Sequence, residues 1–205
     1  MTQISFGNDS SGPQFGINHG VIKAGFKYKY WKSEPRGLLW ITGKPGAGKS
    51  TLMAFLHGKL EILQIGNQGI QLDFFFTARG TEMQRTPLGM LRSLLNQIFA
   101  RDATIRRLVR EVYEKRSRQF GFGDRKWKWP QTVLEELLAD VILASASRKH
   151  VTVFVDALDE TRAESAQQLA AYFHRLIERA AKKNAAIRIC ISCRHYPIIR
   201  SAQAI

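Results

Sequence analysis

Short apolar blocks alternate along the chain with longer stretches in which apolar residues recur every three or four positions. The blocks lie at 38–42, 72–77, 151–155 and 187–192. A continuous apolar run of this length is typical of a parallel strand that is covered on both faces. We therefore predict four strands. Their alternation with helical segments predicts βαβ units and a parallel sheet with right-handed crossovers.

The stretches between these blocks have the spacing of amphipathic helices. We predict helices over 52–60, 87–100, about 105–119, 132–146 and 163–182. The helix near 105 is rich in basic residues and ends before Phe120-Gly121-Phe122-Gly123, which predicts a turn. Thr132-Val133-Leu134-Glu135 has the spacing of a capping box, which predicts that the fourth helix begins there.

The first 30 residues differ from the remainder, because they are rich in Gly, Asn and Ser and have no helical period. We treat 1–30 as a tail and 31–205 as one domain. Apolar residues in the tail alternate with polar ones around turn sequences, at Ile4, Phe6, Phe15, Ile17 and Val21. Two interpretations follow. The tail is a flexible leader, or its short strands stack in register with copies of themselves and drive self-assembly.

Composition supports one α/β domain, since the chain has 205 residues of which 44% are hydrophobic. No apolar run is long enough to span a membrane, and the amino terminus has no signal-peptide pattern, so we expect a cytoplasmic protein. Cys190 and Cys193 are three apart in one predicted strand, where their side chains point to opposite faces. This favours reduced thiols over a redox or metal pair.

The formal net charge of +14 indicates nucleic acid or an anionic surface as a partner only if the charge is concentrated. Residues 101–128 carry ten Lys or Arg against four Asp or Glu, and Trp127 and Trp129 lie at the end of this stretch. Basic residues beside aromatic ones are typical of single-strand binding. A solvated helix face followed by a loop anchored by tryptophan is the alternative, and we favour it.

The strongest chemical signal is Gly43-Lys44-Pro45-Gly46-Ala47-Gly48-Lys49-Ser50, followed by Thr51, which fits G-x-x-x-x-G-K-[ST]. Glycines let backbone N–H groups turn toward a phosphate, and the helix that follows adds a partial positive charge. Lys49 is expected to reach the outer phosphates, and the Ser50 hydroxyl to hold Mg²⁺. The alternative is a glycine-rich turn without function. The position between a predicted strand and a predicted helix favours a site for ATP or GTP.

A second constellation, VTVFVDALDE, places Asp156 at the carboxyl end of a predicted strand. Ligands of open α/β sheets bind at such strand ends. In phosphate-loop nucleotidases an acidic residue at this place holds Mg²⁺ together with the loop hydroxyl. Asp159 and Glu160 follow closely, so we predict that one of them orients or deprotonates an attacking water.

Together these motifs resemble the NACHT-type signal-transducing nucleotidases, specifically the fungal nephrocystin-3-like amino-terminal domain. The resemblance covers residues 36 to about 200 and includes GLLWITGKPGAGKSTLM, LDFFFTARGTEMQRTPLGMLRSLLNQI, VFVDALDE and IRICISCRHYP. It implies a three-layer α/β P-loop NTPase of the ASCE/STAND type with a mainly parallel sheet. It also implies a small residue after Asp156, here Ala157, an acidic Asp159, and a sensor role for Arg194 at the terminal phosphate.

Members of this family act as nucleotide-dependent switches that self-associate, as in NOD-like receptors. The first residues, SFGNDSSGPQFGINHG, resemble the amyloid-type motifs that precede such domains in fungal receptors. The family carries a longer segment before the residue that corresponds to Arg36, and a further strand, a lid and a winged helix after Arg200. We therefore expect a truncated domain with a sheet incomplete at its carboxyl-terminal end, in which the phosphate-loop strand lies at the edge unless the tail covers it.

The leading hypothesis is a nucleotide-binding switch domain that hydrolyses ATP or GTP weakly, with Mg²⁺ as cofactor. One alternative is a non-hydrolysing interaction fragment whose first residues drive self-assembly. Another is an ATPase stimulated by nucleic acid. Expected partners are the nucleotide, further copies of the chain and signalling proteins whose identity the sequence does not indicate.

Overall fold

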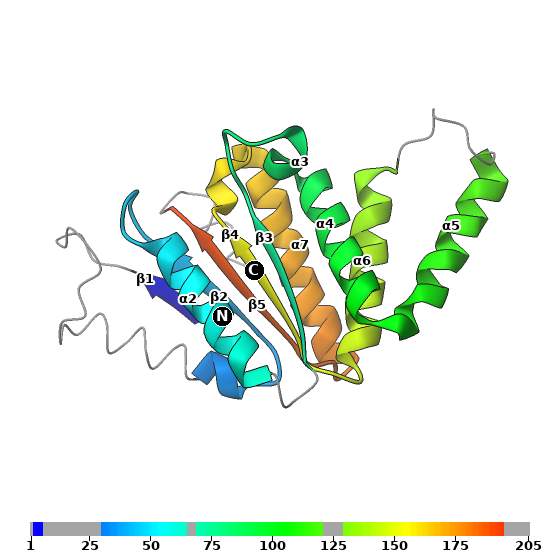
Figure 1. The fold of residues 1–205 in the computed structure, drawn as a ribbon, viewed down its shortest axis with the longest axis horizontal. Coiled ribbons are helices and arrows are strands. Elements are labelled where there is room, and N and C mark those ends of the chain that lie inside the picture. Colours follow the sequence, from blue (N-terminus) through cyan, green and yellow to red (C-terminus); the bar gives the residue numbers. More distant parts are fainter. Residues whose placement is uncertain (1, 6–29, 65–68, 121–128, 195–205) are drawn as a thin grey trace.

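The fold is organised around one sheet of five parallel strands (Figure 1). The computed structural model describes residues 2–5, 30–64, 69–120 and 129–194. Across the sheet the strands follow the order β1-β2-β5-β4-β3, and every neighbouring pair is parallel. The strands are β1 (Thr2–Ser5), β2 (Gly37–Thr42), β3 (Ile70–Phe75), β4 (Val151–Asp156) and β5 (Ile187–Cys193).

Helices connect these strands and cover both faces of the sheet (Figure 1). They are α2 (Lys49–Gln64), α3 (Glu82–Arg85), α4 (Pro87–Arg101), α5 (Arg106–Phe120), α6 (Gln131–Ala146) and α7 (Ala163–Lys182). Two short 3₁₀ helices, η1 (Ala103–Ile105) and η2 (Leu158–Glu160), lie between them, and residues 30–33 form a helical turn before β2.

The sheet divides the core into two clusters of buried apolar side chains, and successive residues of β2 point into opposite clusters. Leu38 and Trp40 belong to the larger cluster, which lies under α4, α6 and α7. Leu39 and Ile41 point the other way, into a smaller cluster with Met53 of α2. The molecule thus has helix, sheet and helix layers, which confirms the predicted three-layer α/β fold of the P-loop NTPase type. Helix α5 lies farthest from the sheet (Figure 1).

The number of strands is a correction, because the sequence predicted four. The fifth is β1, formed by Thr2–Ser5, which pairs with β2 in parallel, Ile4 opposite Ile41. The alternating pattern around Ile4 allowed a short strand, but it did not indicate the partner, which is β2, far along the chain. The tail therefore covers the edge of the phosphate-loop strand. The remaining apolar positions of the tail, from Phe6 to Val21, lie outside the described residues.

The predicted helices and strands agree with those observed to within a few residues, and α7 agrees at both ends. The predicted capping box at Thr132 is wrong. Helix α6 begins one residue earlier, after Pro130, and no side chain caps it. Glu135, the expected second member of the box, instead accepts a hydrogen bond from Gln131 Nε2 at 2.8 Å. Because the helix starts early, Glu135 lies one full turn inside it and bonds to a side chain.

The segment before β2 is fastened to the sheet, although its sequence indicated only a connector. Trp31 is 2% exposed, and its Nε1 donates to the Gly37 carbonyl at 3.1 Å. The Arg188 guanidinium lies 5.7 Å from the centre of the Trp31 ring. Arg36 Nη2 donates to Asn184 Oδ1 at 2.6 Å. These contacts join both ends of the domain at the amino-terminal end of β2 and so fix the strand that leads into the glycine-rich loop.

A buried carboxylate, that of Asp102 between α4 and η1, connects these two elements to the carboxyl-terminal end of α6. Asp102 is 2% exposed and accepts hydrogen bonds from Ser145 Oγ at 2.6 Å, Thr104 N at 2.9 Å and Thr104 Oγ1 at 2.6 Å. Arg148 Nη2 lies 3.2 Å from its second oxygen. Burial alone would raise the pKa of Asp102, but these bonds and the Arg148 charge lower it to about 2.

Replacing this residue, Asp102→Asn, should remove a stabilising contribution that depends on pH. The folded pKa lies below the ordinary value of 3.8, so the contribution is present above about pH 4 and is lost as the pH falls toward 2. We expect the variant to lose about 2 kcal/mol of unfolding free energy at pH 7 and little near pH 2. Urea unfolding at several pH values measures this, with the exposed Asp140→Asn as control. A loss of equal size at pH 7 and pH 2.5 would contradict the assignment.

Candidate functional site

The loops that follow β2 and β4 lie at the same end of the sheet as the last residues of β5, because parallel strands end at the same edge (Figure 1). Thr42, the last residue of β2, lies opposite Cys193 of β5, and Val155 of β4 lies opposite Ile191. Since β5 is the single strand between them, β2 and β4 are about 10 Å apart. The glycine-rich loop and the acidic loop after β4 therefore border the same space, as the sequence predicted.

The glycine-rich loop needs its glycines. Gly46 and Gly48 have φ of +77° and +74°, in the region that other residues rarely adopt. A Cβ at either position would meet no atom within 4 Å, so space does not demand glycine and the backbone conformation does. Helix α2 begins at Lys49, directly after this loop. The unpaired N–H groups of its first turn therefore lie at the end of the loop.

Lys49 folds back over the loop. Its Nζ donates to the carbonyl oxygens of Gly43 at 3.0 Å and Lys44 at 2.9 Å. Its charge also acts at the end of β5: burial and the Asp159 carboxylate raise the pKa of Cys193, and the Lys49 ammonium opposes them, which leaves the pKa at about 12. The ammonium is thus held between the loop and the end of the neighbouring strand.

Asp156 is held by a hydroxyl that the sequence analysis did not single out. The carboxylate is 4% exposed and accepts a hydrogen bond from Ser192 Oγ. Ser192 Oγ in turn accepts from the backbone N–H of Ala157 at 2.9 Å. Ala157 has φ of +54°, a left-handed conformation that turns the chain sharply after the strand. Ser192 therefore fixes both the carboxylate and the turn that follows it.

The two carboxylates beyond Asp156 also have partners. Asp159 Oδ2 lies 2.8 Å from Arg194 Nε, and Asp159 Oδ1 accepts from the Arg194 backbone N–H at 2.9 Å. The Asp159 side chain is 7% exposed, whereas that of Arg194 is 45% exposed. Glu160 Oε2 accepts from the Ala78 N–H at 2.6 Å, which ties η2 to the loop after β3. Arg194 is thus paired with a carboxylate in this structure.

The oxygen ligands expected for Mg²⁺ are a hydroxyl and a carboxylate. Ser50 is exposed in the first turn of α2, and Asp156 ends β4 two strands away. Hard oxygen ligands of this kind suit Mg²⁺, which commonly keeps several waters and binds substrate phosphates. Within the described ranges, no three His, Cys, Asp or Glu side chains form a metal cage. The residues present fit a Mg²⁺ that completes its shell with phosphate and water.

Most of the predicted site residues lie at this edge of the sheet, but they differ in their exposure to solvent. Lys44 and Pro45 are exposed, Ala47 is partly buried, and Thr51 is exposed on α2. Ser192 was missed, although a polar residue within the apolar run Ile-Arg-Ile-Cys-Ile-Ser-Cys is a usable signal. Ala78 was also missed, because it contributes only its backbone N–H and no side-chain pattern marks it. Cys190 and Cys193 are buried free thiols in opposite clusters, as predicted.

Comparisons with known proteins identify similar sequences. The family model described as "Nephrocystin 3, N-terminal" matches residues 22–194. The chain is 25% identical over 179 residues to the vegetative incompatibility protein HET-E-1 of Podospora anserina. That alignment covers 87% of this chain and 12% of the fungal protein, so the chain spans a small part of its relative. No solved structure matches significantly.

Proposed function

The chain belongs to the nephrocystin 3 N-terminal family, and from that premise we propose that it binds a nucleoside triphosphate, ATP or GTP, with Mg²⁺. The observation that carries the proposal is the loop from Gly43 to Ser50. Its two glycines adopt left-handed φ values, Lys49 lies over it, and a helix begins where it ends. Backbone N–H groups, a helix amino terminus and an ammonium are three independent sources of positive potential for a phosphate chain.

Each residue has a role that follows from its place. Backbone N–H groups of Gly46 and Gly48 would cradle phosphate oxygens, joined by that of Ala47 once it leaves the Lys44 carbonyl, to which it donates at 3.2 Å. Lys49 would leave its two carbonyl partners to contact the outer phosphates. The Ser50 hydroxyl and the Asp156 carboxylate would hold Mg²⁺, which, when bound, neutralises phosphate charge. Ser192 would keep Asp156 in its orientation, since it donates to that carboxylate. Thr51, one residue further along α2, would support the same phosphates.

Hydrolysis is proposed to be weak. Phosphoryl transfer to water needs a positioned water and stabilised charge at the terminal phosphate. Asp159 is the first candidate to position water, yet it is paired with Arg194, and Glu160 is bonded to the Ala78 N–H. For Arg194 to act at the terminal phosphate, its pair with Asp159 must open. Binding therefore requires fewer rearrangements than turnover.

Isothermal titration of the protein with ATP and with GTP, each in Mg²⁺ and in EDTA, tests the proposal. We expect saturable binding of one nucleotide per chain that is stronger with Mg²⁺, together with slow phosphate release in the same samples. Absence of saturable binding up to about 1 mM of both nucleotides, which corresponds to only about −4 kcal/mol, would contradict it. The result also distinguishes ATP from GTP.

The proposed biological role is that of a switch domain in a fungal NOD-like signalling protein. HET-E-1, to which the chain is similar, is by its name a vegetative incompatibility protein. We propose that nucleotide exchange controls self-association of the domain in the cytoplasm. Within the described ranges no helix is both long and apolar enough to cross a membrane.

The alternative function, self-assembly driven by the first residues, would require a change in the strand pairing of the described fold. The backbone of Thr2–Ser5 is paired with β2 in the described fold. Assembly through this segment would replace those bonds with bonds to another copy. The alternative of an ATPase stimulated by nucleic acid rests on the basic stretch around α5, whose surface is described below.

A further inference from the structure

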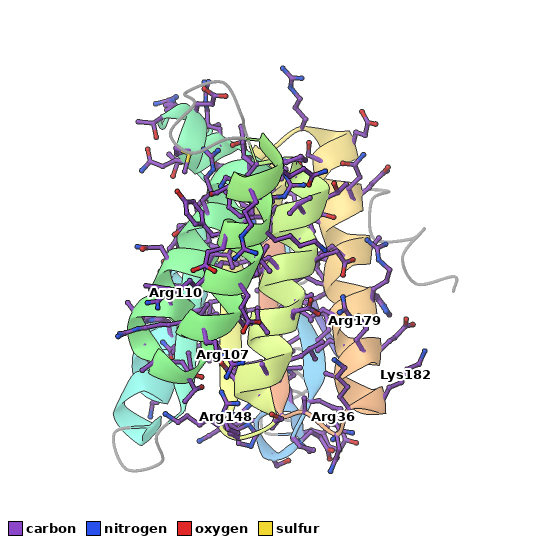
Figure 2. All side chains as sticks on the ribbon, turned by 90° about the vertical axis from the view of Figure 1, so that its right-hand side faces the viewer. Arg36, Arg107, Arg110, Arg148, Arg179 and Lys182 are labelled. Carbon is purple, nitrogen blue, oxygen red and sulfur yellow. The ribbon has the colours of Figure 1, made fainter. Side chains whose placement is uncertain are left out.

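A hollow of about 440 Å³ lies between α4, α5 and α6, the helices that Figure 2 views with α5 in front. It is separate from the glycine-rich loop and shares no residue with it. We call it the α4/α5 groove. Its lining consists of Arg92, Leu95, Asn96, Phe99, Arg106, Val109, Arg110, Tyr113, Trp129, Leu134 and Leu137. Its volume lies in the range of about 300–1,000 Å³ that is usual for small-ligand sites, so it admits side chains rather than a whole domain.

The two walls have the same construction. Each wall is a helical stripe with the spacing i, i+3, i+4, i+7, which places four side chains on one face. The α4 wall is Arg92, Leu95, Asn96 and Phe99, and the α5 wall is Arg106, Val109, Arg110 and Tyr113. The floor is apolar, since Leu134 and Leu137 of α6 are both buried. The groove is therefore an elongated channel between two helices over the face of a third.

Large apolar side chains in this groove face solvent. Phe99 on one wall is 39% exposed and Tyr113 on the other is 46% exposed. Val109 is partly buried and packs on the main core from the same wall as Tyr113. An exposed apolar surface that continues into a buried floor is typical of an interaction site.

The charge of the groove has one sign. Arg92, Arg106 and Arg110 contribute guanidinium groups, and among the described residues no carboxylate lines the groove. Arg106 lies 5.6 Å from the centre of the Phe99 ring and donates to the Phe99 carbonyl at 3.4 Å. Figure 2 labels Arg110 on α5, and no ion pair to a carboxylate is recorded for it in the described structure. An occupant with apolar side chains and carboxylates would complement both properties.

We propose that the α4/α5 groove binds an acidic amphipathic helix of another protein. Its apolar residues, at i, i+3, i+4 and i+7, would lie on Leu134 and Leu137, and its carboxylates would face Arg92 and Arg110. This is the helix-in-groove mode of peptide recognition, in which a preformed channel takes one apolar helix face. Charge complementarity of this kind raises the association rate and fixes the orientation of the partner.

Two other occupants fit less well. A second copy of this chain would bring a net charge of +14 to a groove that is already basic. Single-stranded nucleic acid needs free aromatic faces on which bases stack. Here the Arg106 guanidinium lies 5.6 Å from the centre of the Phe99 ring, and that of Arg116 lies 5.6 Å from the centre of the Trp129 ring, so guanidinium groups would compete with bases for both rings. The floor of the groove is also aliphatic rather than aromatic.

The test uses the full chain and three fluorescent probes in about 0.15 M salt. The first is a designed 16-residue helical peptide with Leu and Phe at i, i+3, i+4 and i+7 and Glu on its other face. The second has the same composition in an order that breaks the apolar stripe, and the third is single-stranded oligouridine. Fluorescence anisotropy is expected to show saturable binding of the first probe, at least about tenfold tighter than of the other two.

Two charge reversals on the same helix locate the site. Arg110 lines the groove, so Arg110→Glu reverses a charge within it. Lys115 lies outside the groove, so Lys115→Glu changes the charge of α5 by the same amount without changing the groove. Both residues are exposed, so circular dichroism should show unchanged folding. We expect Arg110→Glu to weaken binding of the striped peptide by about tenfold or more and Lys115→Glu by less than about threefold.

Four outcomes would overturn the proposal: no saturable binding of the striped peptide, equal binding of the two peptides, equal effects of the two reversals, or tighter binding of oligouridine. The last would favour a nucleic-acid surface. A dimer of the chain that dissociates with Arg110→Glu and excludes the peptide would also overturn it, in favour of a second copy.

Discussion

The variant Lys49→Ala is expected to lower the affinity for Mg·ATP or Mg·GTP about a hundredfold, which corresponds to about 3 kcal/mol. The Lys49 ammonium is held over the glycine-rich loop by bonds to the carbonyls of Gly43 and Lys44. Its removal leaves the phosphate charge facing backbone N–H groups alone. Isothermal titration measures the loss.

A control is available in the same loop. Lys44→Ala removes the same side chain from an exposed position, and we expect it to change the affinity less than about threefold. Thermal unfolding should show similar midpoints for both variants, because Lys49 bonds only to the loop in the described structure. Equal losses of affinity in the two variants would show that general charge, and not the position of Lys49, attracts the nucleotide.

The variant Asp156→Asn is expected to remove most of the Mg²⁺ dependence of nucleotide binding. Asparagine has nearly the same shape and its oxygen can still accept from Ser192 Oγ, so the turn at Ala157 should persist. The negative charge is lost, and with it the attraction for Mg²⁺. We expect affinity in Mg²⁺ to fall about tenfold to a hundredfold, and affinity in EDTA to stay unchanged or rise, because like-charge repulsion with phosphate disappears.

Titrations of wild type and variant in Mg²⁺ and in EDTA separate these effects. Asp73→Asn, a carboxylate of β3 that lies 3.5 Å from His57 Nε2, is the matched strand control. A loss that is equal in Mg²⁺ and in EDTA would indicate damage to the fold near β4. It would speak against Asp156 as a metal ligand.

The sequence alone predicted those features that depend on residues close to one another along the chain. The apolar runs of β2 to β5 and the period of α7 follow from which side chains must be buried, and the glycine-rich loop follows from the conformations that Gly46 and Gly48 supply. The order of the strands in the sheet does not follow from local sequence. Nothing in the composition of β5 specifies that it lies between β2 and β4, so the residues alone did not predict this order.

The features that the sequence did not reveal depend on distant partners. Ser192 becomes a site residue because β5 brings its hydroxyl to Asp156. Trp31 is buried because it packs in the smaller core cluster with residues of β2, α2, β4 and β5. The pairing of Asp159 with Arg194 is a third case. Asp159 was a candidate because it closely follows Asp156, and Arg194 because of the family resemblance, but neither signal indicated that the two residues would bind each other.

The position of β2 has a consequence for the order in which the domain is built. Its two neighbours are β1 and β5, the first and the last of the described strands in sequence order. The strand that carries the glycine-rich loop therefore obtains its hydrogen-bond partners from segments that lie on either side of it and far from each other in the sequence. Contacts so distant in sequence form late and fold slowly. We expect the nucleotide site to form late in folding, because β2 lacks one of its two neighbours until β5 has docked beside it.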